Sequence, residues 1–241
     1  MKLYDGIISD TMEVLESYRD LDGVKKYPYA GSSWKDNESS EFIMQRDVAL
    51  ELGAGGEPSV NYTLVSTSGI VTEDEVLVYG PDINEIKGNT AFARIVILDT
   101  KDLKEDQDTE IAFAAIRNLE FVRYHVFPKG YMVRVSARSN QEQIRISQGA
   151  FSNGINFAKV GALYIKKYKE VPEVKKVRVI FITEKELVEK LMPNADKADT
   201  ITKTLTHILD GMPTDCGHCS MKPVCDEVEG MKELHLGKKK Q

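Results

Sequence analysis

Helical spacing of apolar residues is the first pattern along the chain. Near its start, apolar side chains follow one another at steps of three, four and one, in the order Leu3, Ile7, Ile8, Met12, Leu15 and Tyr18. This spacing predicts an amphipathic helix over residues 3–21. Similar patterns predict four more helices, over residues 103–125, 154–171, 184–192 and 195–211. Thr183, with Glu186 three residues later, predicts a capping box at the start of the helix over 184–192.

Runs rich in β-branched residues lie between these helices and predict strands. They cover residues 60–68, 75–86, 90–100, 130–138, 142–147 and 175–183. The glycines of "ELGAGGEPS" (51–59) predict a tight turn between strands, because neither a phosphate-binding lysine nor a helix follows them. Residues 22–40 are rich in Gly, Ser, Pro and Asn and predict an irregular connection.

Helices and strands are mixed along the chain without strict alternation, and the sequence has no internal repeat. This order predicts an α+β fold with a mixed, largely antiparallel sheet and packed helices, followed by a C-terminal cysteine-rich metal-binding segment. We expect an N-terminal helix within residues 1–26, an α+β domain over 27–211, and the cysteine-rich segment with a basic tail over 212–241.

Composition and charge narrow the functional classes. The 241 residues carry a net charge of −6, whereas a general nucleic-acid or membrane-surface binder needs a basic footprint. No apolar run approaches the ~20 residues that cross a bilayer, and the N-terminus has no signal-peptide core. We therefore expect a cytoplasmic protein, whose thiols stay reduced. The lysines of "GKKKQ" (237–241) are interpreted as a solvated end.

All three cysteines of the chain lie close together near its end. Cys216, Cys219 and Cys225 form a C-x2-C-x5-C pattern, and a C-x2-C turn points both of its sulfurs the same way. Two chemistries fit: a [4Fe-4S] cluster, which is normally held by four thiolates, and zinc, which also accepts three cysteines and a histidine. We favour the cluster, because zinc ribbons usually have a second, well separated C-x2-C pair that is missing here.

The fourth ligand of this metal centre is open. Asp226, His218 and His235 are near in sequence, and a partner subunit is a further source. An iron atom without a fourth protein ligand would instead bind a substrate or another small ligand. Nothing in the sequence decides among these alternatives.

Two long stretches of the chain resemble one known family. They are "DVALELGAGGEPSVNYTLVSTSGIVTEDEVLVYGPDINEI" (47–86) and "EQIRISQGAFSNGINFAKVGALYIKKYKEVPEVKKVRVIFITEKELVEKL" (142–191). Both resemble the middle domain of acetyl-CoA synthase, the β subunit of the carbon monoxide dehydrogenase/acetyl-CoA synthase complex. The likeness extends over residues 27–225 and implies a truncated, free-standing relative of that subunit.

The resemblance also bears on the cysteines. In that family a [4Fe-4S] cluster is held by four cysteines, and the second of them bridges to nickel. Cys216 and Cys219 match the first pair, and Cys225 matches the third cysteine after a shorter interval. The chain has no fourth cysteine and no Cys-Gly-Cys pair, which the family uses for its second nickel. The resemblance therefore implies a cluster without the dinickel site, and it leaves open whether the chain is an enzyme.

The family's middle domain also carries a tryptophan and arginines proposed to meet coenzyme A. Arg134, Arg138 and Arg145 are present in the matching region here, but the only tryptophan is Trp34. The resemblance implies an accessory or electron-transfer protein of anaerobic one-carbon metabolism, whose partner is a corrinoid protein or a carbon monoxide dehydrogenase-type enzyme. An enzyme with an open-iron cluster and a zinc-stapled interaction module are the alternatives.

Overall fold

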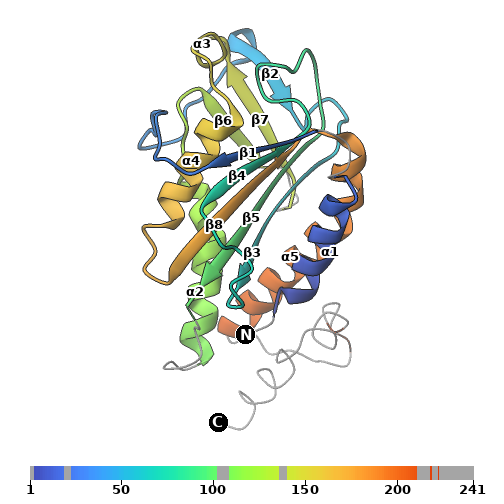
Figure 1. Cartoon of the computed structure of the whole chain (residues 1–241), viewed down its shortest axis with the longest axis vertical. Coiled ribbons are helices and arrows are strands. Elements are labelled where there is room, and N and C mark those ends of the chain that lie inside the picture. The colour runs from blue at the N-terminus through green and yellow to red at the C-terminus, as the bar shows by residue number, and fades with distance from the viewer. Residues whose placement is uncertain are drawn as a thin grey trace.

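The computed structural model describes residues 3–18, 23–101, 109–135 and 140–210, together with His218 and Lys222. These residues form helices and two sheets, which confirms the predicted α+β class (Figure 1). No helix in the described part of the chain is both long and apolar enough to span a bilayer. Most of the segment 212–241 lies outside the described residues, so its metal-binding role stays a prediction. The boundaries at residues 26 and 211 stay predictions too.

The larger sheet has five strands in the order β1-β4-β8-β5-β3. Their bounds are β1 (Val24–Pro28), β3 (Ser59–Ser66), β4 (Glu75–Tyr79), β5 (Phe92–Thr100) and β8 (Val174–Ile182). β4 runs parallel to β8 and β3 runs parallel to β5, whereas β1 with β4 and β5 with β8 are antiparallel pairs. Every residue of β3, β4 and β5 is buried. Such continuous burial is typical of strands that are covered on both faces.

The smaller sheet has three strands in the order β2-β7-β6. Their bounds are β2 (Val48–Leu52), β6 (Tyr131–Val135) and β7 (Glu142–Ser147), and both pairings are antiparallel. Along β7, buried and half-buried residues alternate strictly, so one face of this sheet packs on the core and the other meets solvent. Four of the six pairings between the described strands are antiparallel, as predicted.

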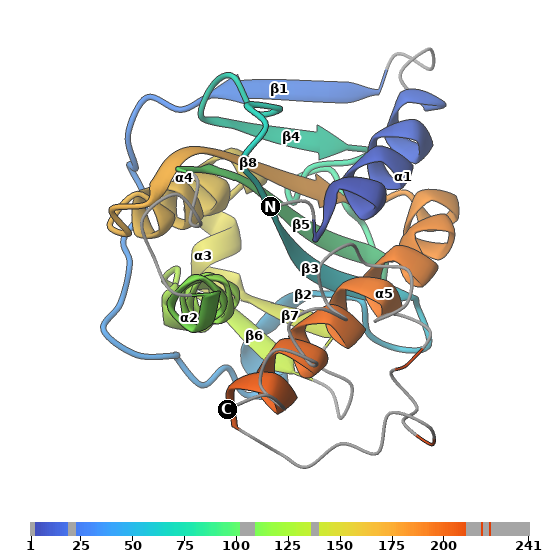
Figure 2. The ribbon, with the colours of Figure 1, turned by 90° about the horizontal axis from the view of Figure 1, so that it is seen from below.

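Helices cover both faces of the larger sheet. The described helices are α1 (Asp5–Glu16), α2 (Thr109–Phe121), α3 (Gln148–Ser152), α4 (Phe157–Tyr168) and α5 (Lys185–Leu209), with short 3-10 helices η1 (Gln45–Asp47) and η2 (Val122–His125). α1 and α5 pack together on one side of the sheet, and α4 packs against β4 and β8 on the other side (Figure 2). Three of the periodic apolar positions that predicted α1, Ile7, Ile8 and Leu15, are buried, together with Thr11.

α4 packs very closely on the larger sheet. The rings of Phe157 and Phe181 stack with their centroids 4.7 Å apart, and Phe92 stacks on both of them. A Cβ added to Gly161 of α4 would lie 2.5 Å from a methyl group of Val76. Glycine therefore lets this helix approach the strand, and any larger residue would push the two apart.

The connection predicted over residues 22–40 is wrong in part, because Val24–Pro28 form the edge strand β1. Its composition resembles a loop because an edge strand is polar and tolerates proline. Lys25 forms an ion pair with Glu85, and Lys26 forms one with Glu73.

α5 replaces the two helices predicted over 184–192 and 195–211, since one helix of 25 residues passes through Pro193. Proline removes one backbone hydrogen bond inside a helix. Pro193 is exposed, however, while Leu191 and Ala195 on either side of it are buried against the core. Packing of the flanking turns thus keeps the helix continuous.

The predicted capping box is also wrong, because α5 begins at Lys185 and Thr183 does not directly precede it. The Thr183 hydroxyl donates a hydrogen bond of 2.8 Å to the carbonyl oxygen of Pro81, so it ties the end of β8 to the turn after β4. A side-chain cap occurs instead at α3, a short helix that the sequence did not predict. There the Ser147 hydroxyl oxygen accepts a hydrogen bond from the backbone N–H of Ala150.

Candidate functional site

The predicted cluster ligands belong to the segment that follows α5. Cys216, Cys219, Cys225, Asp226 and His235 lie outside the described residues, and the remaining candidate, His218, is exposed. Within the described ranges, no three His, Cys, Asp or Glu side chains are close enough to hold a metal ion. Among the described residues, polar clusters and pockets are the remaining candidates for a functional site.

A buried ion pair joins the two sheets. The Arg94 guanidinium on β5 donates to both carboxylate oxygens of Glu142 on β7, over 2.9 Å from Nε and 2.5 Å from Nη2. Both side chains are almost fully buried, and the guanidinium lies over the ring of Tyr164. Burial opposes the charge on Arg94, but Glu142 and Tyr164 outweigh that effect and raise the pKa of Arg94 well above its ordinary value. The two hydrogen bonds of this pair therefore tie β5 of the larger sheet to β7 of the smaller one.

A second buried pair, Glu120 with Arg123, lies beside a small polar cavity between α5 and β3. The two side chains are 2.8 Å apart. Burial raises the pKa of the Glu120 carboxyl, although Arg123 and Arg94 pull it down. The cavity has a volume of about 10 Å³, which is room for about one water molecule. It is too small for a substrate, so we assign this cluster a structural role.

A larger pocket forms around the only tryptophan. Its volume is about 420 Å³, within the range of small-molecule sites. Residues before β2, around the start of β6 and in α3 line it: Trp34, Lys35, Glu41, Lys129, Gly130, Ser147, Gly149, Ala150 and Asn153. These segments lie together because an isolated antiparallel β-bridge pairs residues 35–37 with residues 127–129.

The indole of Trp34 is held at one wall of this pocket. Its Nε1–H donates a hydrogen bond of 3.0 Å to the carbonyl oxygen of Lys129. The ammonium group of Lys159 lies 5.1 Å from the ring centroid, within cation–π distance. Lys159 also donates to the carbonyl oxygen of Gly154, which fixes its position. The ring and the charge next to it are thus preorganised.

The charge at the mouth of the pocket is positive. Lys35 and Lys129 are exposed, and neither has an ion-pair partner among the described residues. The one carboxylate in the lining, Glu41, accepts a hydrogen bond of 2.9 Å from the backbone N–H of Gly130. Gly130 has a positive φ of 72°, and a side chain there would clash with Ala150. An aromatic wall below lysines suits a ligand that carries both an aromatic ring and phosphate groups.

The arginines implied by the family resemblance divide into different roles. Arg145 on β7 is engaged by Glu51 (2.6 Å), Gln45 (2.6 Å) and the carbonyl oxygen of Ile43 (3.3 Å). It therefore clamps the segment that follows Glu41 of the pocket, and it is not free to meet a ligand. Arg134 on β6 is half-exposed, with only a distant contact to Glu51 at 3.9 Å. Arg138 lies outside the described residues.

Sequence reasoning missed the lysines of the pocket. Lys35, Lys129 and Lys159 come from three separate segments, and none belongs to a local motif. Only the fold brings them around Trp34. To predict the pocket, one would have to know that residues 35–37 pair with residues 127–129. No pattern in the sequence indicates that pairing.

Fold and pocket together define an α+β domain with a cationic, aromatic-walled pocket. Comparison with known proteins identifies its family. A family model described as "CO dehydrogenase/acetyl-CoA synthase complex beta subunit" matches residues 36–188, and the chain belongs to that family. Those residues run from just after Trp34 into the first turn of α5, so the cysteines and Trp34 lie outside the matched range.

Two curated relatives are similar over the same share of the chain. The acetyl-CoA decarbonylase/synthase complex subunit beta of Archaeoglobus fulgidus is 28% identical over 157 residues, which are 63% of this chain and 28% of the relative. The carbon monoxide dehydrogenase/acetyl-CoA synthase subunit alpha of Moorella thermoacetica is 25% identical over 154 residues, which are 63% of this chain and 20% of the relative. The chain thus spans less than a third of the length of either relative.

Proposed function

We propose that this chain is an iron–sulfur accessory protein of anaerobic one-carbon metabolism. It would pass electrons to, or dock with, a corrinoid protein or a carbon monoxide dehydrogenase-type enzyme in the cytoplasm. The observation that carries the proposal is the placement of three thiols, Cys216, Cys219 and Cys225, soon after α5 ends at Leu209 in a chain of this family.

The donor set fits a cluster better than it fits the alternatives. Three thiolates occupy three corners of a [4Fe-4S] cube, and Asp226, His218, His235 or a partner subunit would complete it. Zinc remains the alternative, with the same thiolates and a histidine, and would make the segment a stapled interaction module. A bound cluster would supply one-electron transfer. The chain's own contribution is to hold it at the end of α5.

We also propose that this chain has no dinickel centre. Low-valent nickel prefers soft sulfur ligands, and three thiolates committed to a cluster leave no further cysteine in the sequence. The isolated chain is then expected not to make acetyl-CoA. A chain that does so over multiple turnovers, when given nickel, a methyl-corrinoid donor, carbon monoxide and coenzyme A, would contradict this part of the proposal.

The cluster assignment is tested by the variant Cys219→Ser. We expect it to lose iron and sulfide and the broad visible absorption of thiolate-bound iron, because it removes one of the paired thiolates. The matched control is Ser220→Ala, the neighbouring polar residue, which should keep both. Thermal unfolding of the two variants should be alike, since the buried core extends from Leu3 to Leu205 and both substitutions lie beyond it. Equal metal content in both variants would refute the assignment.

A second candidate function is favoured by the pocket at Trp34. We propose that it binds the nucleotide end of coenzyme A, with the adenine against the indole and the phosphates near Lys35 and Lys129. The relatives are named for acetyl-CoA chemistry. The pocket has an aromatic wall, and its lysines Lys35 and Lys129 form no ion pair with any described residue. This function does not depend on the metal.

The single tryptophan makes the pocket directly observable, because all indole fluorescence reports on Trp34. We expect coenzyme A to change this fluorescence saturably, and pantetheine, which lacks the nucleotide, to have little effect. Lys129→Gln should weaken binding by up to about fivefold, the effect of one exposed charge pair. Lys166→Gln, an exposed lysine of α4 outside the pocket, should not. Equal affinities for the two variants would contradict the assignment.

A further inference from the structure

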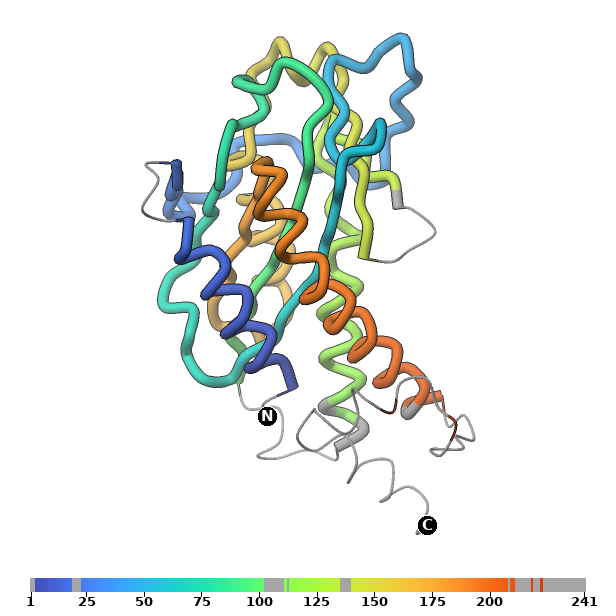
Figure 3. The backbone as a smooth tube through the Cα atoms, turned by 90° about the vertical axis from the view of Figure 1, so that its right-hand side faces the viewer, coloured from blue at the N-terminus to red at the C-terminus, as the bar shows by residue number. Residues whose placement is uncertain are grey.

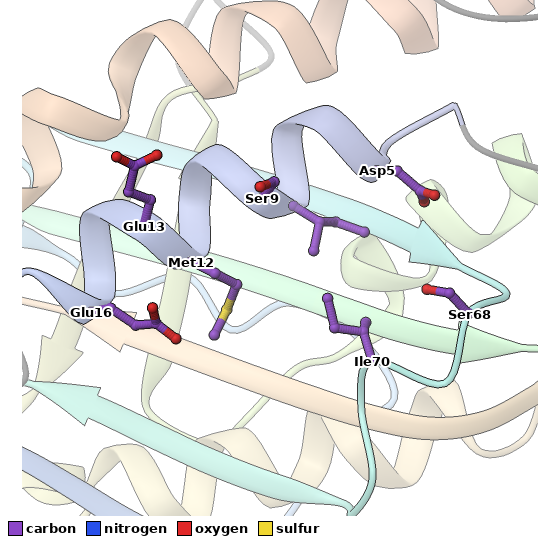
Figure 4. A pocket seen from close by; sticks show the side chains of 8 residues that line it. Asp5, Ser9, Met12, Glu13, Glu16, Ser68 and Ile70 are labelled. Atoms are coloured by element: carbon purple, nitrogen blue, oxygen red, sulfur yellow. The ribbon is translucent and has the colours of Figure 1, made fainter.

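A second surface depression lies between α1 and the loop that follows β3. Its volume is about 370 Å³. It is lined by Asp5, Ile8, Ser9, Met12, Glu13, Glu16, Ser68 and Ile70. Figure 4 shows Met12 and Ile70 pointing into the same space, with Asp5 and Glu16 at its two ends. We call this feature the α1 groove.

The floor of the α1 groove is apolar and partly uncovered. Ile8 is buried beneath it, Met12 is half-buried, and Ile70 is 39% exposed. Large apolar side chains are usually covered when they lie side by side, because their burial is favourable. The floor therefore offers a site for apolar side chains of a partner segment.

The rim of the α1 groove is acidic, and the described residues bring no countercharge to it. Asp5, Glu13 and Glu16 form no ion pair within the described part of the chain, whereas the neighbouring Asp10 pairs with Lys197. Glu13 and Glu16 also lie in the last turns of α1, where no basic residue accompanies them. Negative charge at this end of a helix is unfavourable. Stability of the helix thus does not explain these two carboxylates, but a cationic partner would.

The chain itself carries a segment of matching chemistry. Residues 231–241, "MKELHLGKKKQ", combine three apolar residues with the lysine run Lys238–Lys240 and a further lysine. The three apolar residues are Met231, Leu234 and Leu236. An apolar, basic segment complements a groove with an apolar floor and an acidic rim.

The path of α5 leads this segment to the groove. α5 runs antiparallel to α1, since Asn194 donates to Thr11 over 3.3 Å and Lys197 pairs with Asp10 over 3.5 Å. The last turn of α5 and the start of α1 therefore lie at the same end of the molecule (Figures 1 and 3). About 20 residues separate Leu209 from Met231, and an extended chain of that length spans up to ~65 Å. α1 is only ~18 Å long.

We propose that residues 231–241 dock in the α1 groove, with the apolar residues on its floor and Lys238–Lys240 against its carboxylates. Tethering raises the effective concentration of the segment to the millimolar range. Docking would hold the cysteine segment beside the start of α1, whichever metal it binds.

Zero-length carbodiimide cross-linking of the full chain at low concentration tests this proposal. The chain offers a matched acidic pair that does not line the groove: Glu186 and Glu189 of α5 are exposed and three residues apart, as Glu13 and Glu16 are. We expect Lys238–Lys240 to cross-link to Glu13 and Glu16 about tenfold more than to the control pair, the ratio that ~1.4 kcal/mol of docking gives. High salt should reduce this preference.

Charge exchange provides the second measurement. Reversing the lysines (K238E, K239E and K240E) should abolish the preference of the remaining tail lysine, Lys232, for the groove. Adding E13K and E16K to that variant should restore cross-linking between tail and groove. The new amines at positions 13 and 16 would then react with the new carboxylates at positions 238–240. Equal yields at Glu13 and Glu186 would overturn the proposal and leave the tail solvated. Cross-links found only between two chains, and rising with concentration, would overturn it in favour of a second copy.

Discussion

The two sheets of this fold differ in what their faces meet. β3, β4 and β5 of the larger sheet are buried along their whole length between α1 and α5 on one side and α4 on the other. β7 of the smaller sheet alternates buried with half-buried residues. The larger sheet is therefore a scaffold, whose side chains are committed to packing. The smaller sheet keeps one face for polar contacts, and the Trp34 pocket opens next to it.

The difference also shows in how the polar residues of the two sheets are used. Arg94 of the larger sheet is enclosed and has Glu142 as its partner, so it supports the fold. Lys129, just before β6, is exposed at the pocket and lacks an ion-pair partner among the described residues. Buried charge holds the sheets together here, and exposed charge near the smaller sheet is available to a ligand.

Removing the Arg94–Glu142 ion pair between the two sheets should change the free energy of unfolding most. Glu142→Gln leaves the Arg94 guanidinium buried without a countercharge, and we expect a loss of ~3–5 kcal/mol in the free energy of unfolding. Denaturant titration measures it. The double variant Arg94→Met/Glu142→Leu should recover most of that loss, because apolar residues replace the pair. A loss below ~1 kcal/mol for Glu142→Gln would show that the pair does not join the sheets as described.

Two glycine-to-alanine substitutions compare the stability effect of a crowded position in the scaffold with that of an open position on α1. Gly161→Ala places a methyl group against Val76 and should cost ~1–3 kcal/mol by overpacking. Gly6→Ala, in the first turn of α1, meets no atom within 4 Å and should be neutral or gain up to ~1 kcal/mol in helix propensity. Thermal unfolding of both variants checks the contrast. The same change in both would contradict the close approach of α4 to β4.

Substitutions on the outer face of the smaller sheet should change the free energy of unfolding least. Arg145→Gln removes the contacts to Glu51 and Gln45, and we expect a loss of ~1 kcal/mol because the site is partly open to water. Arg134→Gln, on the same face but with only a 3.9 Å contact, should change stability by less than ~0.5 kcal/mol. If Arg134→Gln is the costlier change, our division of the arginines is wrong.

The sequence predicted the scaffold well, because burial leaves a strong pattern. β3 and β5 appeared as runs of β-branched residues, and α1 appeared through its apolar spacing. Prediction failed where tertiary contacts override local preference. β1 resembles a loop because its lysines pair with acids far along the chain. α5 continues through Pro193 because the residues on either side of it are buried.

The candidate sites were predictable to a different degree. The cysteine spacing is a local pattern and could be recognised directly, although its metal is not decided by the fold. The Trp34 pocket could not be predicted, since Lys129 and Lys159 reach it from separate segments. The close fit of Gly161 to Val76 also has no local signal.

The metal content of the anaerobically purified chain tests the central claim most directly. Iron, acid-labile sulfide, zinc and nickel should be measured on the same sample, with the protein quantified by amino-acid analysis. We predict about four irons and four sulfides per chain, the composition of one cubane cluster, with neither zinc nor nickel in stoichiometric amount. One zinc per chain without iron would contradict the account and make the cysteine segment a structural staple.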